Sequence, residues 1–375
     1  MILQMPKIFP TGPSGPAAPR IYLGQQRLEA TAIYGALASL SVTAPRKGPA
    51  TGTMVLTCYR DERGRWPVID DGYFERWMPL RIDVDFESFA QHLVTGFVLK
   101  MTPEFPEDRS EAKLTVEFQD ETAMLDRQQI ERVWPGDDRG QPVTDRFVLS
   151  AILAGYAQGF RIASSTAEGQ TSATLNQAKT DFAFLTERAD ASAFEFRIRD
   201  REAYLGPPQL TGTPQPVITV YAGASSNAQE FKAEDSADTP AAALAASVEG
   251  GQDNVENIRL QPDLPLLGDQ ALPNGQGVPD YELRVQPQGD AAATNLRALA
   301  QGQINEASLA IKAEVTIDGT LYGHVLLAGA LVEVDGVGSR YGGRWYVDSV
   351  EHDMDAEGYR QKAVLLRNAI GQTGP

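Results

Sequence analysis

Short segments of alternating apolar and polar residues, with turn residues between them, dominate both ends of this chain. Leu80, Ile82 and Val84 alternate with small or charged residues, and the segment 113–120, KLTVEFQD, follows the same pattern. The pattern returns between residues 308 and 370. A period of two is typical of a strand with one buried face. Several such strands at close spacing predict an antiparallel barrel or sandwich at each end of the chain.

The middle of the chain changes to the spacing of helices. Thr144 or Asp145 is expected to cap a helix that stops at Gly159, and Thr180 is expected to cap a second one. A third helix is predicted over residues 291–307, where apolar side chains recur every three or four positions. The first two helices, together with a strand that follows the second one, predict a small α/β domain over about residues 121–206.

One more helix is predicted after Thr239, which is a candidate cap, with Pro240 at the first helical position. The stretch from Glu249 to Val278 is rich in Gly, Asn, Asp, Gln and Pro, and is expected to be a loop or an irregular insertion. No exact repeat is visible along the chain. The two strand-rich ends are still compatible with two similar barrels that have lost their sequence similarity.

A chain of 375 residues is long enough for two or three domains. The predicted fold class is α+β, mainly β: two antiparallel β-barrels with an inserted α/β domain and a second helical/loop insertion. The expected segments are a Pro/Gly-rich arm at 1–18, a first β-barrel at 19–120, a small α/β domain at 121–206, a second β-barrel at 207–235 and 312–370, an insertion with helices and a loop at 236–311, and a C-terminal tail at 371–375.

The charge of the chain excludes two classes of partner. Asp and Glu number 50 against 33 Lys and Arg, a formal net charge of −17. A protein held on nucleic acid by phosphate contacts needs a basic face, and so does one docked on anionic lipid. The acidic balance leaves two interpretations. It serves solubility and repulsion before assembly, or it forms the wall of a channel along which DNA slides without sticking.

Cys58 is the single cysteine, so we expect neither an internal disulfide nor a metal site built from cysteines. Its neighbours, MVLTCYR, are typical of a strand and predict a buried thiol. This is compatible with synthesis in a reducing cytoplasm. No stretch approaches the roughly 18 apolar residues of a membrane span. The N-terminus does not build the apolar core of a signal peptide.

The three histidines are poor candidates for a metal site. His92, His324 and His352 lie far apart in the sequence, and no HxH or HExxH spacing occurs. We expect them to be surface or edge-strand residues. The sequence thus predicts no metal, no cofactor and no catalytic residue.

Paired carboxylates occur, but next to turn residues. Asp70-Asp71, Glu107-Asp108 and Asp137-Asp138 each lie beside glycine or proline, and such pairs are usually solvated turn residues.

The run from Gly336 to Gly343 lacks the third glycine of a dinucleotide loop and precedes a strand, so it predicts a long hairpin turn.

Three groups of segments resemble one known family. Near the C-terminus the chain reads LLAGALVEV, GRWYVDSVEH and GYRQKAVLLRN; in the middle it reads NQAKTDFAFLTERA, FEF and LGPP; before these it reads LTVEFQD and LDR. In this order they resemble the late control protein D family of contractile-tailed phages, which includes the hub halves of type VI secretion spikes. The segments lie at 326–334, 343–352 and 358–368, at 176–189, 194–196 and 205–208, and at 114–120 and 125–127.

The resemblance covers about residues 19–370 and departs from the family pattern in two places. The usual aromatic-Gly-Tyr of the last hairpin is here Gly343-Arg-Trp-Tyr, and Ala193 stands where the family has glycine. The resemblance implies two hub barrels side by side in each subunit and a homotrimer that forms a threefold ring of six similar barrels. Such a ring adapts a sixfold tail tube to a threefold spike and encloses a lumen.

The implied function is that of the structural central hub of a contractile tail baseplate, and not that of an enzyme. The protein would be a late virion protein of the viral tail, made in the host cytoplasm. Its implied partners are the tail tube protein, baseplate wedge proteins and a separate spike protein, because the family's fused spike parts do not follow Pro375. DNA would pass through the lumen without specific binding, and no membrane or cofactor is involved.

A ring of this kind needs interfaces that close it. Strand edges that pair across subunit boundaries are no longer exposed, and a closed threefold ring uses a heterologous interface. The candidate interface residues lie in the late strands and are Val332, Val334, Trp345 and Val347. Packing in the core of one chain explains the same residues equally well.

Two rival functions remain open at the sequence level. A tail-tip cell-wall hydrolase would need two carboxylates at the right separation in a cleft. A carbohydrate-binding adhesin would need an exposed aromatic platform, which four scattered tryptophans do not suggest.

Overall fold

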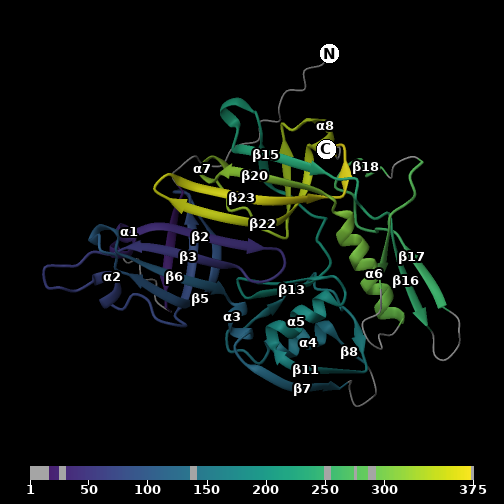
Figure 1. The fold of residues 1–375 in the computed structure, drawn as a ribbon, viewed down its shortest axis with the longest axis horizontal. Coiled ribbons are helices and arrows are strands. Elements are labelled where there is room, and N and C mark those ends of the chain that lie inside the picture. Colours follow the sequence, from purple (N-terminus) through teal and green to yellow (C-terminus); the bar gives the residue numbers. More distant parts are fainter. Residues whose placement is uncertain are drawn as a thin grey trace.

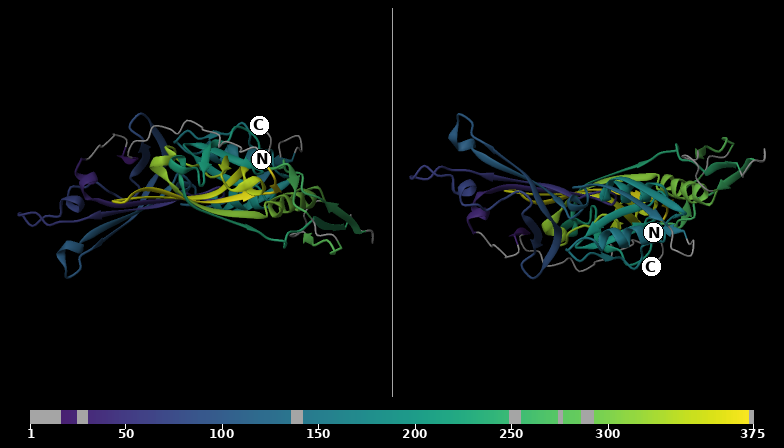
Figure 2. Two further views of the ribbon diagram at one scale, coloured as in Figure 1. Left: turned by 90° about the horizontal axis from the view of Figure 1, so that it is seen from above. Right: turned by 90° about the horizontal axis from the view of Figure 1, so that it is seen from below.

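The computed structural model describes residues 17–24, 31–135, 142–248, 255–273, 277–285 and 293–372. Most of the predicted arm and of the predicted tail lies outside these residues. The described chain forms one long sheet, a small α/β domain beside it and an insertion at one end (Figure 1). Seen from above and below, the sheet is a layer that runs along the length of the molecule (Figure 2).

The long sheet has twelve strands and consists of two halves. The strand order of the first half is β1-β4-β5-β6-β3-β2, and that of the second is β14-β21-β22-β23-β20-β15. The first-half strands are β1 Ala18–Leu23, β2 Leu37–Pro45, β3 Thr51–Thr57, β4 Pro79–Asp85, β5 Ala90–Glu104 and β6 Lys113–Asp120. The second-half strands are β14 Gln215–Thr219, β15 Ala228–Asp235, β20 Ile311–Asp318, β21 Leu331–Asp335, β22 Gly343–Asp355 and β23 Gly358–Arg367.

The two halves have the same topology. Numbered along the chain within each half, the strands follow the order 1-4-5-6-3-2 in both. Neighbouring strands are antiparallel, with one difference: β14 runs parallel to β21, whereas β1 runs antiparallel to β4. The halves are joined where β2 pairs with β22, that is, strand two of one half with strand five of the other. The predicted class, mainly β with antiparallel barrel-like parts and helical additions, is confirmed.

A β-bulge on strand two falls at the same place in both halves. The pairing of β2 with β3 shifts register between Leu37 and Ser39, and that of β15 with β20 shifts between Ala228 and Glu230. A bulge inserts one extra residue into one strand of a pair and increases the local twist. Ser39 of the first half therefore corresponds to Glu230 of the second.

A second shared bulge lies on strand five. The pairing of β5 with β6 shifts between Val98 and Lys100, and that of β22 with β23 shifts between Val347 and Ser349. The strand-five bulge lies opposite strand six directly, at Phe118 in β6 and at Leu365 in β23. Traced through strand three, the strand-two bulge falls four residues away on strand six in both halves, at Leu114 and at Gln361. The halves therefore share residue register as well as strand order, which indicates a duplicated unit. Lys100 corresponds to Ser349.

Each half has its own apolar core. The first contains Met54, Ile82 and Val116, and the second contains Val315 and Trp345, all at most 3% exposed. These residues occupy alternate positions of their strands, as the period of two predicts. Met354 and Tyr359 of the second half pack into the first core, so the junction is itself a packed contact. Cys58 is buried in the core of the first half, as predicted.

The α/β domain packs two helices against small sheets. Thr144 and Thr180 cap α4 and α5 as predicted, because their hydroxyls accept hydrogen bonds from the Phe147 and Ala183 amides at 3.1 Å. The domain's elements are α3 Thr122–Leu125, β7 Gln129–Pro135, β8 Val143–Thr144, α4 Asp145–Leu153, β9 Arg161–Ile162, β10 Thr171–Ser172, β11 Thr174–Thr180, α5 Asp181–Asp190, β12 Glu195–Arg199 and β13 Glu202–Gly206.

The insertion is a helix on a three-stranded sheet. Helix α6, Ala293–Ser308, agrees with the helix predicted over 291–307. The helix predicted after Thr239 and Pro240 is wrong, because the segment is strand β16, Ala242–Val248, in the middle of this sheet. The other elements are β17 Val255–Leu260 and β19 Glu282–Val285, with β18 Gln270–Ala271 pairing β24 Ala369–Ile370.

The remaining helices are short, with three to six residues each, and lie between strands. The run Gly336–Gly343 joins β21 to its antiparallel partner β22, so the predicted hairpin turn is confirmed. Its Gly336, Gly338 and Gly343 have φ of 89°, 77° and 107°, which favour glycine. No described helix combines the length and the apolar character that crossing a bilayer requires. The short helices are α1 Thr31–Ala36, α2 Pro67–Asp70, α7 Gly319–Tyr322, α8 Gly338–Tyr341 and the 3₁₀ turns Arg109–Glu111 and Gly223–Ser225.

Candidate assembly surface

The pairing of β2 with β22 shows how one half of the sheet binds another. Ser41 lies opposite Asp353, and its hydroxyl donates to that carboxylate at 2.9 Å on the polar face. Leu40 lies opposite Met354 on the other face, where both are at most 5% exposed. The junction therefore combines a main-chain ladder, a polar pair on one face and an apolar pair on the core face.

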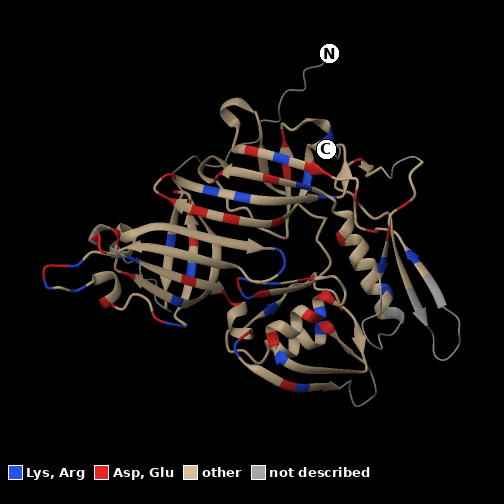
Figure 3. Ribbon diagram, in the orientation of Figure 1, with Lys and Arg blue, Asp and Glu red and all other residues tan. Residues whose placement is uncertain are grey.

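The polar face of strands two, three, five and six runs across both halves. In β2 and β3 it carries hydroxyl side chains: Ser39, Ser41, Thr43, Thr51 and Thr53. In β5, β6 and the second half it carries charged side chains of both signs (Figure 3). Many of its cations pair with acids on the same face, as in Lys100–Glu117 at 2.6 Å, Lys362–Asp353 at 2.9 Å and Arg360–Asp355 at 2.9 Å.

Several strand edges of the described sheet are open, since β1 and β14 also have one partner strand each, but two of them correspond to the two sides of the internal junction. β15 pairs with β20 on one side only. β5 pairs with β4 up to Phe97 and with β6 as far as Glu104, so its last residues have a ladder on one side only. In the second half the corresponding end of β22 is the part that pairs with β2. Unpaired edges are templates for pairing with another chain.

The four residues that the sequence suggested for the interface lie inside one chain. Val332, Val334, Trp345 and Val347 are at most 1% exposed and belong to the core of the second half. Core packing, the alternative explanation for them, describes this environment. The open edges were not identified from the sequence, because only the pairing of strands far apart in the chain reveals which strands lack a second neighbour.

A buried ionic cluster, which we call the Arg46 cluster, joins four parts of the molecule. Arg46 follows β2 and pairs with Glu195 of β12 at 2.8 Å, with Asp348 of β22 at 2.7 Å and with Glu306 of α6. The Tyr346 hydroxyl also donates to Glu195, at 2.8 Å. Burial disfavours the charged guanidinium, but the hydrogen bonds and charges of Glu306 and Glu195 outweigh it and raise the pKa of Arg46.

The histidines occupy three separate environments. His352 is 1% exposed in a central strand, so its predicted place at the surface or on an edge is wrong. Its Nδ1 lies 2.8 Å from the Tyr359 hydroxyl. His92 contacts Asp83 at 3.1 Å, and His324 lies against the ring of Phe89. Among the described residues, no three His, Cys, Asp or Glu side chains form a cluster that could hold a metal.

The paired carboxylates that the structure describes belong to turns. Asp70 accepts from the Trp66 amide at 2.7 Å, and Asp108 accepts from the Ser110 amide at 2.9 Å. Asp137 and Asp138 lie outside the described residues.

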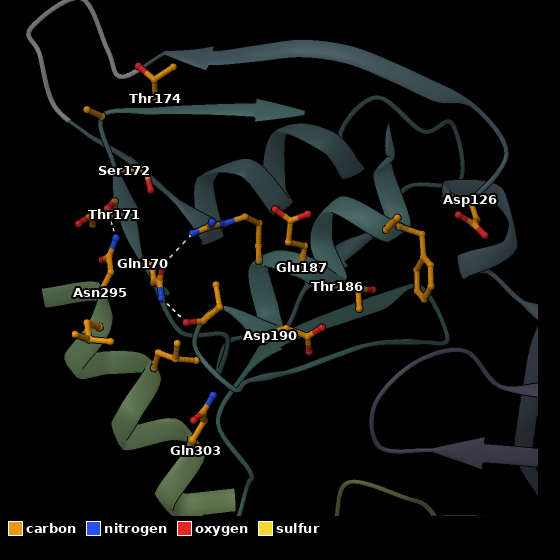
Figure 4. A pocket seen from close by; sticks show the side chains of 17 residues that line it. Asp126, Gln170, Thr171, Ser172, Thr174, Thr186, Glu187, Asp190, Asn295 and Gln303 are labelled. Atoms are coloured by element: carbon orange, nitrogen blue, oxygen red, sulfur yellow. Dashed lines mark hydrogen bonds between the residues drawn. The ribbon is translucent and has the colours of Figure 1, made fainter. Parts of the chain in front are cut away.

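A cleft of about 1320 Å³ lies between α5 and α6 (Figure 4). Three carboxylates line it, of Asp126, Glu187 and Asp190. Asp126 accepts from the Thr180 hydroxyl at 2.5 Å, and Glu187 pairs with Lys179. Two of the three carboxylates are thus engaged in contacts within the α/β domain. Because α5 of this domain and α6 of the insertion both line the cleft, it marks the contact between the two parts.

The sequence model of the family described as Alg8 N-terminal domain matches residues 36–356. The chain belongs to this family. The match covers ten of the twelve strands of the long sheet, all but β1 and β23, together with the α/β domain and the insertion, so membership in the Alg8 N-terminal domain family applies to most of the described fold. No curated protein is significantly similar to this family member in sequence.

Solved structures show that this member of the Alg8 N-terminal domain family has the fold of phage tail proteins. The prophage MuSo2 43 kDa tail protein from Shewanella oneidensis is 12% identical, with a TM-score of 0.67 over 94% of this chain and 99% of that one. A tail protein from Neisseria meningitidis MC58 is 11% identical, with a TM-score of 0.64 over 95% and 98%. The late control protein D resemblance implies the same type of fold.

A type VI secretion protein has the same fold. The E. coli c3393 protein, a component of the type VI secretion system with structural similarity to the T4 tail proteins gp27 and gp5, is 11% identical. Its TM-score is 0.56 over 92% of this chain and 76% of that one. At such low identity these likenesses describe the fold alone.

Proposed function

We propose that this protein is the central hub subunit of a contractile tail or a related injection machine, and that three copies form its ring. The observation that carries the proposal is the duplicated half with its strand-two to strand-five junction. One such junction is made inside the chain, and the second copy of each partner strand, β15 and the end of β5, keeps one unpaired edge. A heterologous contact that repeats can close into a ring. Three chains would present six similar halves.

The structural role follows from this arrangement. Six similar halves can face a sixfold tail tube, while three chains can face a threefold spike. The polar face of the sheet would line the lumen, where acids neutralise many of the cations that would otherwise bind DNA phosphates. Tail tube, spike and baseplate wedge proteins are the proposed partners, and the role needs no catalysis. The likeness to phage tail and type VI secretion proteins supports this proposal.

Mass measurement of the purified chain tests the proposal. We expect a particle with three times the 40.7 kDa of one chain, seen as a ring in electron micrographs, and no lysis of cell-wall material. A chain that stays monomeric at tens of micromolar would contradict the hub. Lysis abolished by changing one carboxylate would instead support the hydrolase.

A further inference from the structure

We infer that β15 of one subunit pairs antiparallel with the end of β5 in the next subunit, in one specific register. This inference rests on the proposed ring and adds its residue contacts. β15 and β5 are the strands that correspond to β2 and β22 through the two shared bulges. Because β2 and β22 already pair inside the chain, their pairing provides the template for the contact between chains.

The register follows from the bulges. Ser41 corresponds to Lys232, since Ser39 corresponds to Glu230, and Asp353 corresponds to Glu104, since Ser349 corresponds to Lys100. Ser41 lies opposite Asp353 within the chain. Lys232 of one subunit should therefore lie opposite Glu104 of the partner subunit.

The polar face supports this register by charge. Lys232 and Glu104 are both exposed, and they carry opposite charges. At the internal junction the equivalent position holds a hydroxyl-to-carboxylate hydrogen bond of 2.9 Å. An ammonium group can make the same contact with the carboxylate as an ion pair. Opposite charges directly across a ladder stabilise it, and like charges destabilise it.

The core face supports the same register. The residue before Lys232 is Phe231 and the residue after Glu104 is Phe105, so Phe231 should lie opposite Phe105 of the partner subunit, as Leu40 lies opposite Met354. Met354 is 5% exposed in the internal junction, whereas Phe105 is 54% exposed in the single chain. Pairing would bury this aromatic ring in the equivalent environment, which accounts for a large apolar side chain at an open edge. Pro103 lacks an N–H, so one rung of the ladder would miss a donor.

Disulfide trapping tests the register. We expect the double variant Lys232→Cys/Glu104→Cys to form disulfides between chains on mild oxidation, because directly opposite side chains have Cβ atoms about 5 Å apart. The matched control is Lys232→Cys/Thr102→Cys, whose pair would be diagonal, about 7–8 Å apart, and should cross-link several-fold more slowly. The parent chain reports any background from buried Cys58.

The outcomes separate the inference from the proposed function. A particle of three chains that cross-links through the control pair, and not through Glu104, would overturn the register and leave the hub in place. A chain that remains monomeric would overturn both.

Charge exchange gives a second readout that does not depend on oxidation. Lys232→Glu should weaken the assembly several-fold, and the added change Glu104→Lys should restore it. Arg284→Glu, the same charge reversal on exposed β19 of the insertion, should leave assembly unchanged. Equal weakening by Lys232→Glu and Arg284→Glu would contradict a specific pair.

Discussion

At the scale of single residues, burial decides what the titratable groups do. His352 is 1% exposed, and burial lowers its pKa to about 3, with the nearby Arg199 charge acting in the same direction. Neutral in the folded chain, it becomes protonated below about pH 6.5 once the chain unfolds. The unfolded state then binds the extra proton, so stability falls as pH drops from about 6.5 toward 3.

We therefore predict that lowering the pH from 7 to 5 reduces the free energy of unfolding by roughly 2 kcal/mol through His352. Denaturant unfolding at several pH values should show a smaller loss for His352→Gln than for the parent chain over this interval. Asp120 acts in the opposite direction, because burial raises its pKa to about 6, so it stabilises the fold as pH falls. Equal slopes for the variant and the parent would show that His352 is not the source.

Ala193 has a backbone conformation that its residue type does not reveal in the sequence. It has a φ of 50°, in the left-handed region where glycine is favoured, and the resembling family has glycine at this position. The departure therefore leaves the turn after α5 in place, with some backbone strain.

At the scale of elements, local signals were reliable where they agreed with packing. The caps Thr144 and Thr180 and the helix α6 were predictable, because a capping hydroxyl or an apolar stripe depends only on residues close together in the sequence. Strand β16 was not. Its alanines favour a helix, but Ala243 and Ala245 pack under Leu296 and Ala300 of α6, so strand pairing and this contact override propensity.

The cap of α5 gives a prediction at this scale. The Thr180 hydroxyl accepts from the Ala183 amide and donates to Asp126. Thr180→Ala should cost about 1–2 kcal/mol of unfolding free energy, and Thr180→Ser much less. Thr186→Ala on the same helix is the control, since within the described residues its buried hydroxyl has no hydrogen-bond partner. Thermal or denaturant unfolding would measure all three, and an equal loss at both sites would argue against the cap.

At the scale of the whole molecule, the sequence indicated the class and the order of parts, but not how strands pair across the chain. β2 and β22 are separated by most of the sequence, and nothing in the residues of either strand indicates that the other is its partner. The Arg46 cluster was unpredictable for the same reason. Its Glu195, Glu306 and Asp348 lie on three elements that only the fold brings together.

Removing Arg46 should loosen the connection between these parts. Arg46→Ala leaves buried Glu195 with Arg197 as its remaining charge partner, and we expect a loss of about 3 kcal/mol. Lys47→Ala is the matched control, because Lys47 binds the same Glu306 at 3.1 Å from a more exposed position and should cost under about 1 kcal/mol. Denaturant unfolding and limited proteolysis between the parts would check this; similar losses for both variants would contradict the role of the cluster.

The hydroxyl-lined strands β2 and β3 occur once per chain, while the strands on either side of them carry charges. In a ring of three chains, the inner wall would therefore have three neutral stripes set between wider charged ones. Its shape would be nearly sixfold, yet its electrostatic potential would repeat only three times around the axis. A polyanion travelling through it would meet threefold symmetry in the field before it met any threefold symmetry in the walls.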